Sequence, residues 1–332
     1  EGAKPNNIYR LILAYLLWSE TEYKKFEEFQ GIKVADIITK LKKGTVPTKA
    51  FEHSIPDWLV ETLEKELGEN WEKEMIALNE QAPTILRANS LKTSTKHLIE
   101  ELKHENVESF QVPGFENAVQ LEEKKNVFLT SAFKDGLFEV QDAGSQKIGE
   151  FLDVKPGMRV VDACAGAGGK TLHLAALMEN KGQIIAMDIH GWKLAELKRR
   201  AKRAGAHNIE TREITDNKVI KRLHEKADRL LIDAPCSGLG VLKRNPDSKW
   251  KIDQDFIDRI RKEQETILQD YSKIIKKGGK MVYATCSILP SENNEQVENF
   301  LKNNPDFKLV KEEKVMPSTG FDGFYMALIE RV

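Results

Sequence analysis

Two cysteines occupy similar positions in the sequence, each just after an apolar run. Cys236 lies in Leu-Ile-Asp-Ala-Pro-Cys-Ser-Gly (231–238), and Cys286 lies in Val-Tyr-Ala-Thr-Cys-Ser (282–287). A cysteine is often only a small buried hydrophobe. Both of these, however, follow the last apolar residue of a predicted strand, where the chain leaves the core and where parallel sheets bind their ligands. We therefore take the two thiols and Asp233 as candidate reactive groups.

Two thiols and a carboxylate suit covalent chemistry on a pyrimidine ring. Carbon 5 is a poor nucleophile, but a thiolate that adds to carbon 6 makes it enamine-like and able to attack an electrophilic methyl group. A carboxylic group such as Asp233 near N3 would assist the addition, and the second thiol would assist removal of the C5 proton or release of the first thiol. The attacking thiolate needs access and nearby positive charge.

A glycine-rich loop, Cys-Ala-Gly-Ala-Gly-Gly-Lys (164–170), separates a strand expected at 159–163 from a helix expected to begin near Thr171. Glycines without a Cβ let a ligand lie against the main chain, and the N-terminus of the next helix favours an anionic group. The spacing is not Gly-x-Gly-x-x-Gly, so the loop alone leaves three possibilities open: a dinucleotide site, a methyl-donor site or a structural turn.

The segment after residue 141 alternates predicted strands with predicted helices, which is the pattern of a doubly wound parallel sheet. The predicted strands are 159–163, 183–188, 209–213, 229–233 and 280–285. Asp188, at the end of the second strand, is placed to accept hydrogen bonds from ribose hydroxyls. Asp216 follows the third strand and is expected to face the adenine side of the same cofactor.

Three motifs together resemble the Nop/Sun family of RNA cytosine-C5 methyltransferases, which includes bacterial ribosomal RNA enzymes. They are Asp-Ala-Pro-Cys-Ser-Gly (233–238), Ala-Thr-Cys-Ser (284–287) followed by Pro-Ser-Glu-Asn-Asn-Glu (290–295), and the glycine loop 164–170. The resemblance covers roughly residues 80–332. It implies an α/β fold of the Rossmann-like S-adenosylmethionine methyltransferase type, a mostly parallel sheet with a C-terminal antiparallel strand.

The resemblance also implies roles for individual residues. Cys286 would be the nucleophile that attacks carbon 6, Cys236 would help the methylated product leave, and Lys170 would be an active-site cation. Asp233 would lie beside both the target base and the cofactor, S-adenosylmethionine. The residues implied in cofactor binding are Cys164, Ala165, Gly166, Ala167, Gly168, Gly169, Lys170, Asp188, Asp216 and Asp233. Ala167 departs from the family, which commonly has proline there.

Three other functions compete with this hypothesis. A DNA cytosine-C5 methyltransferase would use the cysteine of a Pro-Cys pair, which Pro235-Cys236 supplies, although the Thr285-Cys286 pair argues against it. A non-catalytic RNA-binding assembly factor would keep the fold without the reaction. A nicotinamide-dependent oxidoreductase would bind a dinucleotide at the glycine loop.

The chain before the catalytic segment divides into two predicted parts. Residues 1–80 are expected to form helices, clearest at 7–19 and 57–67, as a remnant of a larger helical domain. Residues 81–140 are expected to form a small α+β RNA-binding unit, followed by the catalytic domain 141–332. In the α+β unit we predict a helix at 95–105 and strands at 84–89, 110–112, 118–121, 127–130 and 137–140.

Composition limits the class of protein. The chain of 332 residues has no apolar run of the roughly 20 residues that a membrane helix needs. Three cysteines without Cys-x-x-Cys spacing disfavour a disulfide scaffold and a zinc site and favour a reducing cytoplasm. We expect no secretory signal, no metal, no membrane partner and a monomer.

The charge is uneven along the chain, with 18 Lys and Arg against 24 Asp and Glu in residues 1–140, and 33 against 28 in 141–332. This modest excess permits an anionic partner at the catalytic half without requiring one, since the charges are also compatible with solvated surface. If the partner is RNA, its target cytosine is expected to be single-stranded or in a loop and to flip into the site. The candidate backbone contacts are Arg87, Lys92, Lys198, Arg199, Arg200, Lys202, Arg203, Lys243, Arg244 and Lys249.

Overall fold

The computed structural model describes residues 5–22, 27–42 and 48–332. Contacts divide the chain into two units, residues 1–54 and 55–332. This division differs from the boundary at residue 80 expected from the sequence. The reason is that the helices between 57 and 78 bury their apolar faces in the core of the second unit.

The first unit is helical. Its described elements are α1 (Pro5–Trp18), the 3₁₀ turn η1 (Glu27–Phe29), α2 (Val34–Lys42) and α3 (Lys49–Glu52). Helix α1 contacts α2, and Leu13 of α1 is buried. The helix expected at 7–19 is thus confirmed. Among the described residues of the whole chain, no helix is both long and apolar enough to cross a bilayer.

The second unit is built on a seven-stranded sheet in the order β10-β11-β9-β8-β5-β6-β7. Strands β7, β6, β5, β8 and β9 are parallel neighbours, and β11 runs antiparallel to both β9 and β10. The bounds are β5 (Arg159–Asp162), β6 (Gln183–Asp188), β7 (Ile209–Glu213), β8 (Ala227–Asp233), β9 (Ile275–Thr285), β10 (Phe307–Val315) and β11 (Phe324–Arg331). The Rossmann-like α/β fold with a C-terminal antiparallel strand is therefore confirmed.

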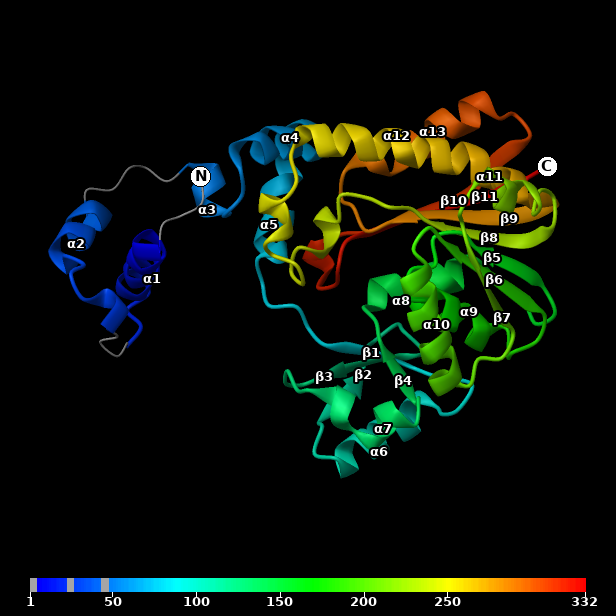
Figure 1. Ribbon diagram of the computed structural model, residues 1–332, viewed down its shortest axis with the longest axis horizontal. Helices are drawn as coiled ribbons and strands as arrows, with labels where there is room; N and C mark the ends of the chain where they lie inside the picture. The colour runs from blue at the N-terminus through cyan, green and yellow to red at the C-terminus, as the bar shows by residue number, and fades with distance from the viewer. Residues whose placement is uncertain (1–4, 23–26, 43–47) are drawn as a thin grey trace. The chain divides into compact units, whose positions relative to one another are not determined.

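Helices cover both faces of this sheet, as Figure 1 shows. Alternate strand residues face opposite cores: Val160 packs with α8 (Ala143–Phe151), α9 (Gly169–Leu177) and α10 (Gly191–Ala204), and Val161 packs on the other side. That second core contains α11 (Asn217–Lys221), α12 (Gln254–Tyr271) and α13 (Asn294–Asn303). Because both faces are buried, β5, β6 and β8 each contain a continuous apolar run, at 160–161, 184–187 and 230–232.

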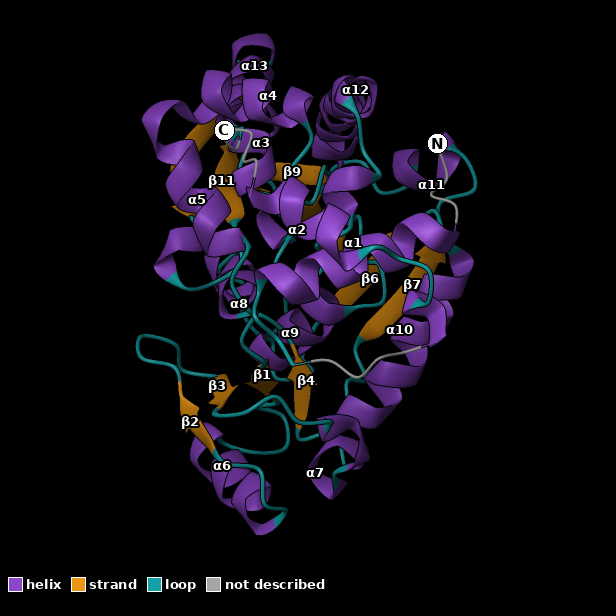
Figure 2. Ribbon diagram, turned by 90° about the vertical axis from the view of Figure 1, so that its left-hand side faces the viewer, coloured by secondary structure: helices purple, strands orange, loops and turns teal. Residues whose placement is uncertain are grey.

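A smaller antiparallel sheet has the order β2-β3-β1-β4. Figure 2 shows its strands beside one another, with two helices beyond them. The elements are β1 (Ile85–Ala88), α6 (Thr95–His104), β2 (Ser109–Gln111), β3 (Ala118–Leu121), η3 (Val127–Leu129), α7 (Ser131–Lys134) and β4 (Phe138–Val140). The predicted strand at 127–130 is wrong. Asn126 accepts a hydrogen bond from the Phe128 amide and Thr130 from the Phe133 amide, and these side-chain caps favour helical turns over extended chain.

Helices α4 (Asp57–Leu67) and α5 (Trp71–Leu78) pack over the loops that follow β8 and β9. Leu59 and Leu63 of α4 share one core with Leu239 of the first loop and with Ile288 of the second. The helices therefore support the part of the chain that carries the two cysteines. The remaining 3₁₀ turns of the second unit are η2 (Gly68–Asn70), η4 (Leu239–Val241), η5 (Ser248–Trp250), η6 (Ser272–Ile274), η7 (Pro290–Glu292) and η8 (Pro317–Thr319).

Candidate active site

The glycine loop joins β5 to α9 through two residues with positive φ. Gly168 (φ +88°) precedes the helix, and a Cβ there would lie 2.5 Å from Cγ of the buried Leu197. Gly166 (φ +54°) has no atom within 4 Å of the place where a Cβ would stand. Gly168 is thus required by packing against α10, whereas Gly166 leaves free space beside the main chain where a ligand can lie.

A cavity of about 280 Å³ opens at the carboxyl ends of the parallel strands. Asp188 lines it with an oriented carboxylate, because Oδ2 accepts from the Gly166 amide (2.9 Å) and Oδ1 from the His190 amide (2.8 Å). The cavity lining combines polar and apolar side chains. Its lining residues include Cys164, Gly166, Asp188, Asp233, Ile189, Ile214, Ile267 and Tyr271.

The structure brings only part of the predicted cofactor set to this cavity. Cys164, Gly166, Asp188 and Asp233 line it, whereas Ala165 is packed in the core of the sheet. The remaining loop residues, Ala167, Gly168, Gly169 and Lys170, do not line the cavity. The Ala167 and Gly169 carbonyls accept hydrogen bonds from arginines, and Lys170 donates to Asp233. Asp216 is exposed and accepts the Lys218 amide as the N-cap of α11, outside the cavity lining. Its contact with adenine stays a prediction.

Lys170 and Asp233 form an ion pair with Nζ 2.7 Å from Oδ2. Only 14% of the lysine side chain and 28% of the aspartate side chain are exposed, and Nζ also lies 5.8 Å from the centre of the Phe324 ring. Burial lowers the pKa of Lys170, but the Asp233 charge, the hydrogen bond with Asp233 and the Cys286 charge outweigh burial and raise it. Lys170 is therefore a permanent cation at neutral pH.

The sulfur atoms of Cys236 and Cys286 are 3.3 Å apart. They meet because β8 and β9 are parallel neighbours in register, with Asp233 opposite Ala284, so each cysteine leaves the sheet at the same edge. The hydrogen bond with Cys286, followed by burial and the charges of Cys286 and Glu292, raises the pKa of Cys236. Burial raises the pKa of Cys164 as well. All three cysteines are free thiols.

One buried and one half-buried arginine hold carbonyl groups of the glycine loop. Arg87 of β1 donates to the Gly169 carbonyl (2.8 Å) and to Gln141. Arg200 of α10 donates to the Ala167 carbonyl (2.8 Å) and pairs with Glu139 of β4. The small sheet is thus tied directly to the loop. The expected contact of Arg87 with an RNA phosphate is wrong, because its side chain is 3% exposed.

Several other basic residues expected to hold RNA are occupied within the fold. Lys249 is buried and donates to Asn79, and Arg244 pairs with Asp142 and Asp322. Arg203 pairs with Glu139, Lys92 donates to the Arg203 and Asp135 carbonyls, and Lys243 donates to the Pro317 carbonyl. The exposed cations of the predicted set on α10 are Lys198, Arg199 and Lys202, of which Arg199 pairs with Glu196.

Sequence reasoning gave no role to two buried polar residues near the cysteines. Glu292 accepts hydrogen bonds from both cysteine loops, and Gln264 of α12 donates to Glu292 and to the Pro235 carbonyl. The motif 290–295 contains Glu292, but its many polar residues resemble an exposed helix start. Within residues 5–22, 27–42 and 48–332, no group of His, Cys, Asp and Glu side chains could hold a metal ion.

Comparison with known families identifies the chain. Residues 150–329 match the family described as 16S rRNA methyltransferase RsmB/F. The chain belongs to this family. Residues 55–128 match the ferredoxin-like domain of RsmF/B-like methyltransferases, which overlaps the small antiparallel sheet. The expected membership in the Nop/Sun methyltransferases is confirmed.

Individual relatives agree with the family. The chain is 36% identical over 290 residues to the probable ribosomal RNA small subunit methyltransferase B of Synechocystis sp., covering 86% of this chain and 63% of the relative. It is 33% identical over 279 residues to the ribosomal RNA small subunit methyltransferase B of Proteus mirabilis, covering 83% and 65%. The chain thus spans less than two thirds of the length of these curated relatives.

Solved structures share the fold. A methyltransferase homologue from Pyrococcus horikoshii superposes with a TM-score of 0.75 at 27% identity, covering 86% of this chain and 98% of that protein. The structure of NSun6 from Pyrococcus horikoshii with SFG superposes with a TM-score of 0.77 at 22% identity, covering 83% and 98%. At that identity the second likeness concerns the fold alone.

Proposed function

We propose that this chain transfers a methyl group from S-adenosylmethionine to carbon 5 of a cytosine in ribosomal RNA. One observation carries the proposal: the two sulfur atoms lie 3.3 Å apart, at the sheet edge that also forms the cavity. The Lys170–Asp233 pair is at the same edge. The small-subunit ribosomal RNA methyltransferases among the relatives favour RNA as the substrate.

The cavity residues suit S-adenosylmethionine. Asp188 offers its remaining lone pairs to ribose hydroxyls, since each oxygen already holds one backbone amide. Ile189, Ile214 and Ile267 offer an apolar wall for the adenine ring, and the space beside Gly166 leaves room against the main chain. When bound, S-adenosylmethionine supplies an electrophilic methyl group.

The charges around the thiols favour Cys286 as the nucleophile. Lys170 interacts with Cys286, and a nearby cation stabilises a thiolate. Cys236 is subject to the negative charge of Glu292, and its pKa is raised. Cys236 is therefore the protonated partner in the free enzyme and donates the hydrogen bond across the 3.3 Å sulfur contact.

The same contact makes the acidity of Cys236 depend on the state of Cys286. The hydrogen bond with Cys286 is the largest cause of the raised pKa of Cys236. Once Cys286 is bonded to the base, it carries no negative charge, and the pKa of Cys236 falls. Cys236 then releases its proton to solvent and acts as the base that removes the C5 proton.

The proposed steps conserve atoms and charge. The Cys286 thiolate forms a bond to C6, and N3 takes a proton that the Asp233 carboxylate passes on from solvent, while Lys170 stays a cation hydrogen-bonded to Asp233. C5, now nucleophilic, accepts the methyl group and still carries its hydrogen. Cys236 removes that proton, the C5–C6 double bond re-forms, and the Sγ–C6 bond breaks to return the Cys286 thiolate. The N3 proton returns through Asp233 to solvent, which restores the Asp233 carboxylate.

Cysteine variants test the assignment. The protein and its Cys286→Ala and Cys236→Ala variants are incubated with small-subunit ribosomal RNA and S-adenosylmethionine, and denaturing gels detect protein–RNA adducts. We expect Cys286→Ala to form no adduct and Cys236→Ala to accumulate it, with bisulfite sequencing locating the 5-methylcytosine. The reverse pattern, with adduct formation dependent on Cys236, would support the DNA-type assignment.

Two further measurements distinguish this methyltransferase from an oxidoreductase and from an assembly factor. Calorimetry with S-adenosylmethionine and with NAD tests the oxidoreductase alternative. Tight binding of NAD without binding of S-adenosylmethionine would overturn the proposal. Ribosome assembly in cells that carry Cys286→Ala addresses the second. Full assembly without 5-methylcytosine would show a role that does not need the reaction.

A further inference from the structure

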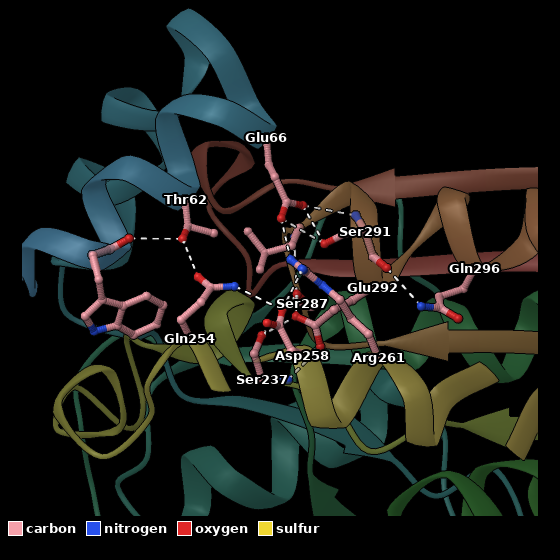
Figure 3. A network of polar contacts seen from close by, with 12 residues as sticks. Thr62, Glu66, Ser237, Gln254, Asp258, Arg261, Ser287, Ser291, Glu292 and Gln296 are labelled. Atoms are coloured by element: carbon pink, nitrogen blue, oxygen red, sulfur yellow. Dashed lines mark hydrogen bonds and ion pairs between the residues drawn. The ribbon is translucent and has the colours of Figure 1, made fainter. Parts of the chain in front are cut away.

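The carboxylate of Glu292 connects the two cysteine loops. Its side chain is fully buried, and its Oε1 accepts from the hydroxyls of Ser237 and Ser287, each at 2.5 Å. Its Oε2 accepts from the Ser237 amide at 2.8 Å and from Gln264 Nε2 at 3.0 Å. Ser237 directly follows Cys236, and Ser287 directly follows Cys286. One side chain therefore holds the residue after each cysteine (Figure 3).

The neighbouring contacts strengthen the same connection. Gln264 also donates to the Pro235 carbonyl at 2.9 Å, so it holds the residue before Cys236. Asn293 donates to the Ser287 carbonyl at 2.9 Å and accepts from the Thr285 hydroxyl, so it holds both sides of Cys286. Hydrogen bonds thus hold the residues on both sides of each cysteine, and Glu292 connects the two loops.

The burial of Glu292 is stable only because all its partners are present. A buried carboxylate without hydrogen bonds is very costly, and here four donors converge on it. Every donor belongs to a cysteine loop or to Gln264, which itself holds one of these loops. If the loops moved apart, the carboxylate would lose donors, and this cost opposes separation of the sulfur atoms.

We propose that Glu292 is a positioning residue that fixes the distance between Cys236 and Cys286. The inference rests on the proposed function for its catalytic consequence, since the sulfur contact matters there for the transfer of protons. The effect of Glu292 on the distance between the two thiols does not depend on the proposed function. Without Glu292, the loops after β8 and β9 lose the carboxylate that both of them contact, and the two thiols separate.

Glu66 provides a matched control. This carboxylate on α4 accepts from the Ser291 amide (3.1 Å) and hydroxyl (2.6 Å) and pairs with Arg261 of α12. It contacts Ser291, the residue before Glu292 (Figure 3), is also mostly buried, and also joins separate elements. Its hydrogen bonds within the described part of the chain go to neither Ser237 nor Ser287. Glu66→Gln therefore perturbs the packing nearby without releasing the cysteine loops.

The test measures the approach of the two thiols directly. In Glu292→Gln the amide oxygen can still accept from the serine hydroxyls, but its NH₂ group faces two donors, the Ser237 amide and Gln264. The reduced proteins are treated with diamide, which oxidises two nearby thiols to a disulfide, with loss of two protons, and is itself reduced to the hydrazine. Mass spectrometry follows the Cys236–Cys286 disulfide with time.

We expect Glu292→Gln to form this disulfide at least about tenfold more slowly than the unchanged protein, because intramolecular reactions depend steeply on alignment. Glu66→Gln is expected to match the unchanged protein. The double variant Ser237→Ala/Ser287→Ala, which removes both hydroxyls, provides a second reading if Glu292→Gln does not fold. Disulfide formation at the unchanged rate in a folded Glu292→Gln or in the double variant would overturn the proposal.

The RNA assay separates this inference from the proposed function. If the unchanged protein forms adducts, Glu292→Gln should still form them through Cys286 but release them more slowly, as Cys236→Ala does. If the unchanged protein forms neither adduct nor 5-methylcytosine, the proposed function fails, while a slower disulfide in Glu292→Gln still supports positioning by Glu292.

Discussion

Alanine substitutions at the glycine loop should separate packing from cofactor binding. Gly168 and Gly166 both have positive φ, so Ala at either position costs about 1–2 kcal/mol. At Gly168 the new methyl would also lie 2.5 Å from Cγ of Leu197, whose side chain is fully buried and has no room to move. Overpacking of this kind typically adds about 1–3 kcal/mol. Gly168→Ala should therefore lose about 2–5 kcal/mol of stability in total.

Gly166→Ala is the matched variant, since nothing lies within 4 Å of its added methyl. It should lose only the backbone cost of about 1–2 kcal/mol. Because Gly166 lines the cavity, its methyl group should instead occupy ligand space and weaken S-adenosylmethionine binding by about tenfold or more, which is about 1.4 kcal/mol. Gly169→Ala, with negative φ and open space, should be as stable as the unchanged protein or slightly more stable.

Thermal unfolding and calorimetry together measure both effects. At about 2–4 °C per kcal/mol, Gly168→Ala should unfold several degrees below Gly166→Ala. The Kd for S-adenosylmethionine should show the largest change in Gly166→Ala among variants that remain folded at the assay temperature. Equal melting temperatures for the two variants would refute the packing argument, and unchanged affinity in Gly166→Ala would refute the location of the cofactor beside this residue.

Buried charges support three further predictions. Lys170→Met should leave Asp233 without its cation at 2.7 Å and reduce methyl transfer by about 100-fold or more. Incorporation of labelled methyl groups into RNA measures this rate. Activity within a few-fold of the unchanged protein would contradict the role of Lys170. Burial raises the pKa of Asp162 to about 7, so the folded state binds a proton at this carboxyl group more tightly than the unfolded state does. The stabilisation is complete below about pH 4 and is lost as the pH rises toward 7. In urea unfolding, the free energy of unfolding of Asp162→Asn should depend less on pH than that of the unchanged protein. Parallel pH profiles for the two proteins would contradict this prediction. Arg87→Lys should weaken S-adenosylmethionine binding by about tenfold in calorimetry, because one ammonium replaces the guanidinium that donates to both Gly169 and Gln141. Lys92→Ala, at an exposed position, is the control and should bind S-adenosylmethionine as the unchanged protein does.

The five parallel strands of the large sheet were predictable from short β-prone runs between helices, and β5, β6 and β8 are buried over most of their length. The segments 183–188 and 209–213 coincide with β6 and β7, and 118–121 coincides with β3 of the small sheet. In these segments the run of β-prone residues was sufficient to predict the strand. It was not enough at 127–130, where Val, Phe and Leu suggested a strand but the caps at Asn126 and Thr130 favour a turn and a helix. A hydrogen-bonded cap there outweighs β propensity.

The roles of charged residues were harder to predict, because a charge on a sequence does not show its partner. Arg200 and Arg203 lie within a run of cations that resembles a solvated or RNA-binding face, yet both pair with Glu139, about 60 residues earlier. Arg87 lies in a strand whose residues are all buried, and its guanidinium contacts the glycine loop instead of solvent. Such pairings depend on how the small sheet docks on α10, which no local pattern contains.

The meeting of the two cysteines was partly predictable and partly not. Their positions after consecutive strands suggest one sheet edge, since parallel strands place their carboxyl ends together. The 3.3 Å contact requires more: the direct pairing of β8 with β9, the buried carboxylate of Glu292 between the loops, and the support of α4 and α5 from outside. Glu292 and Ser237 are 55 residues apart in sequence. The site is therefore assembled by long-range contacts, and the helices before residue 80 belong to its structural support as much as the sheet that carries the thiols.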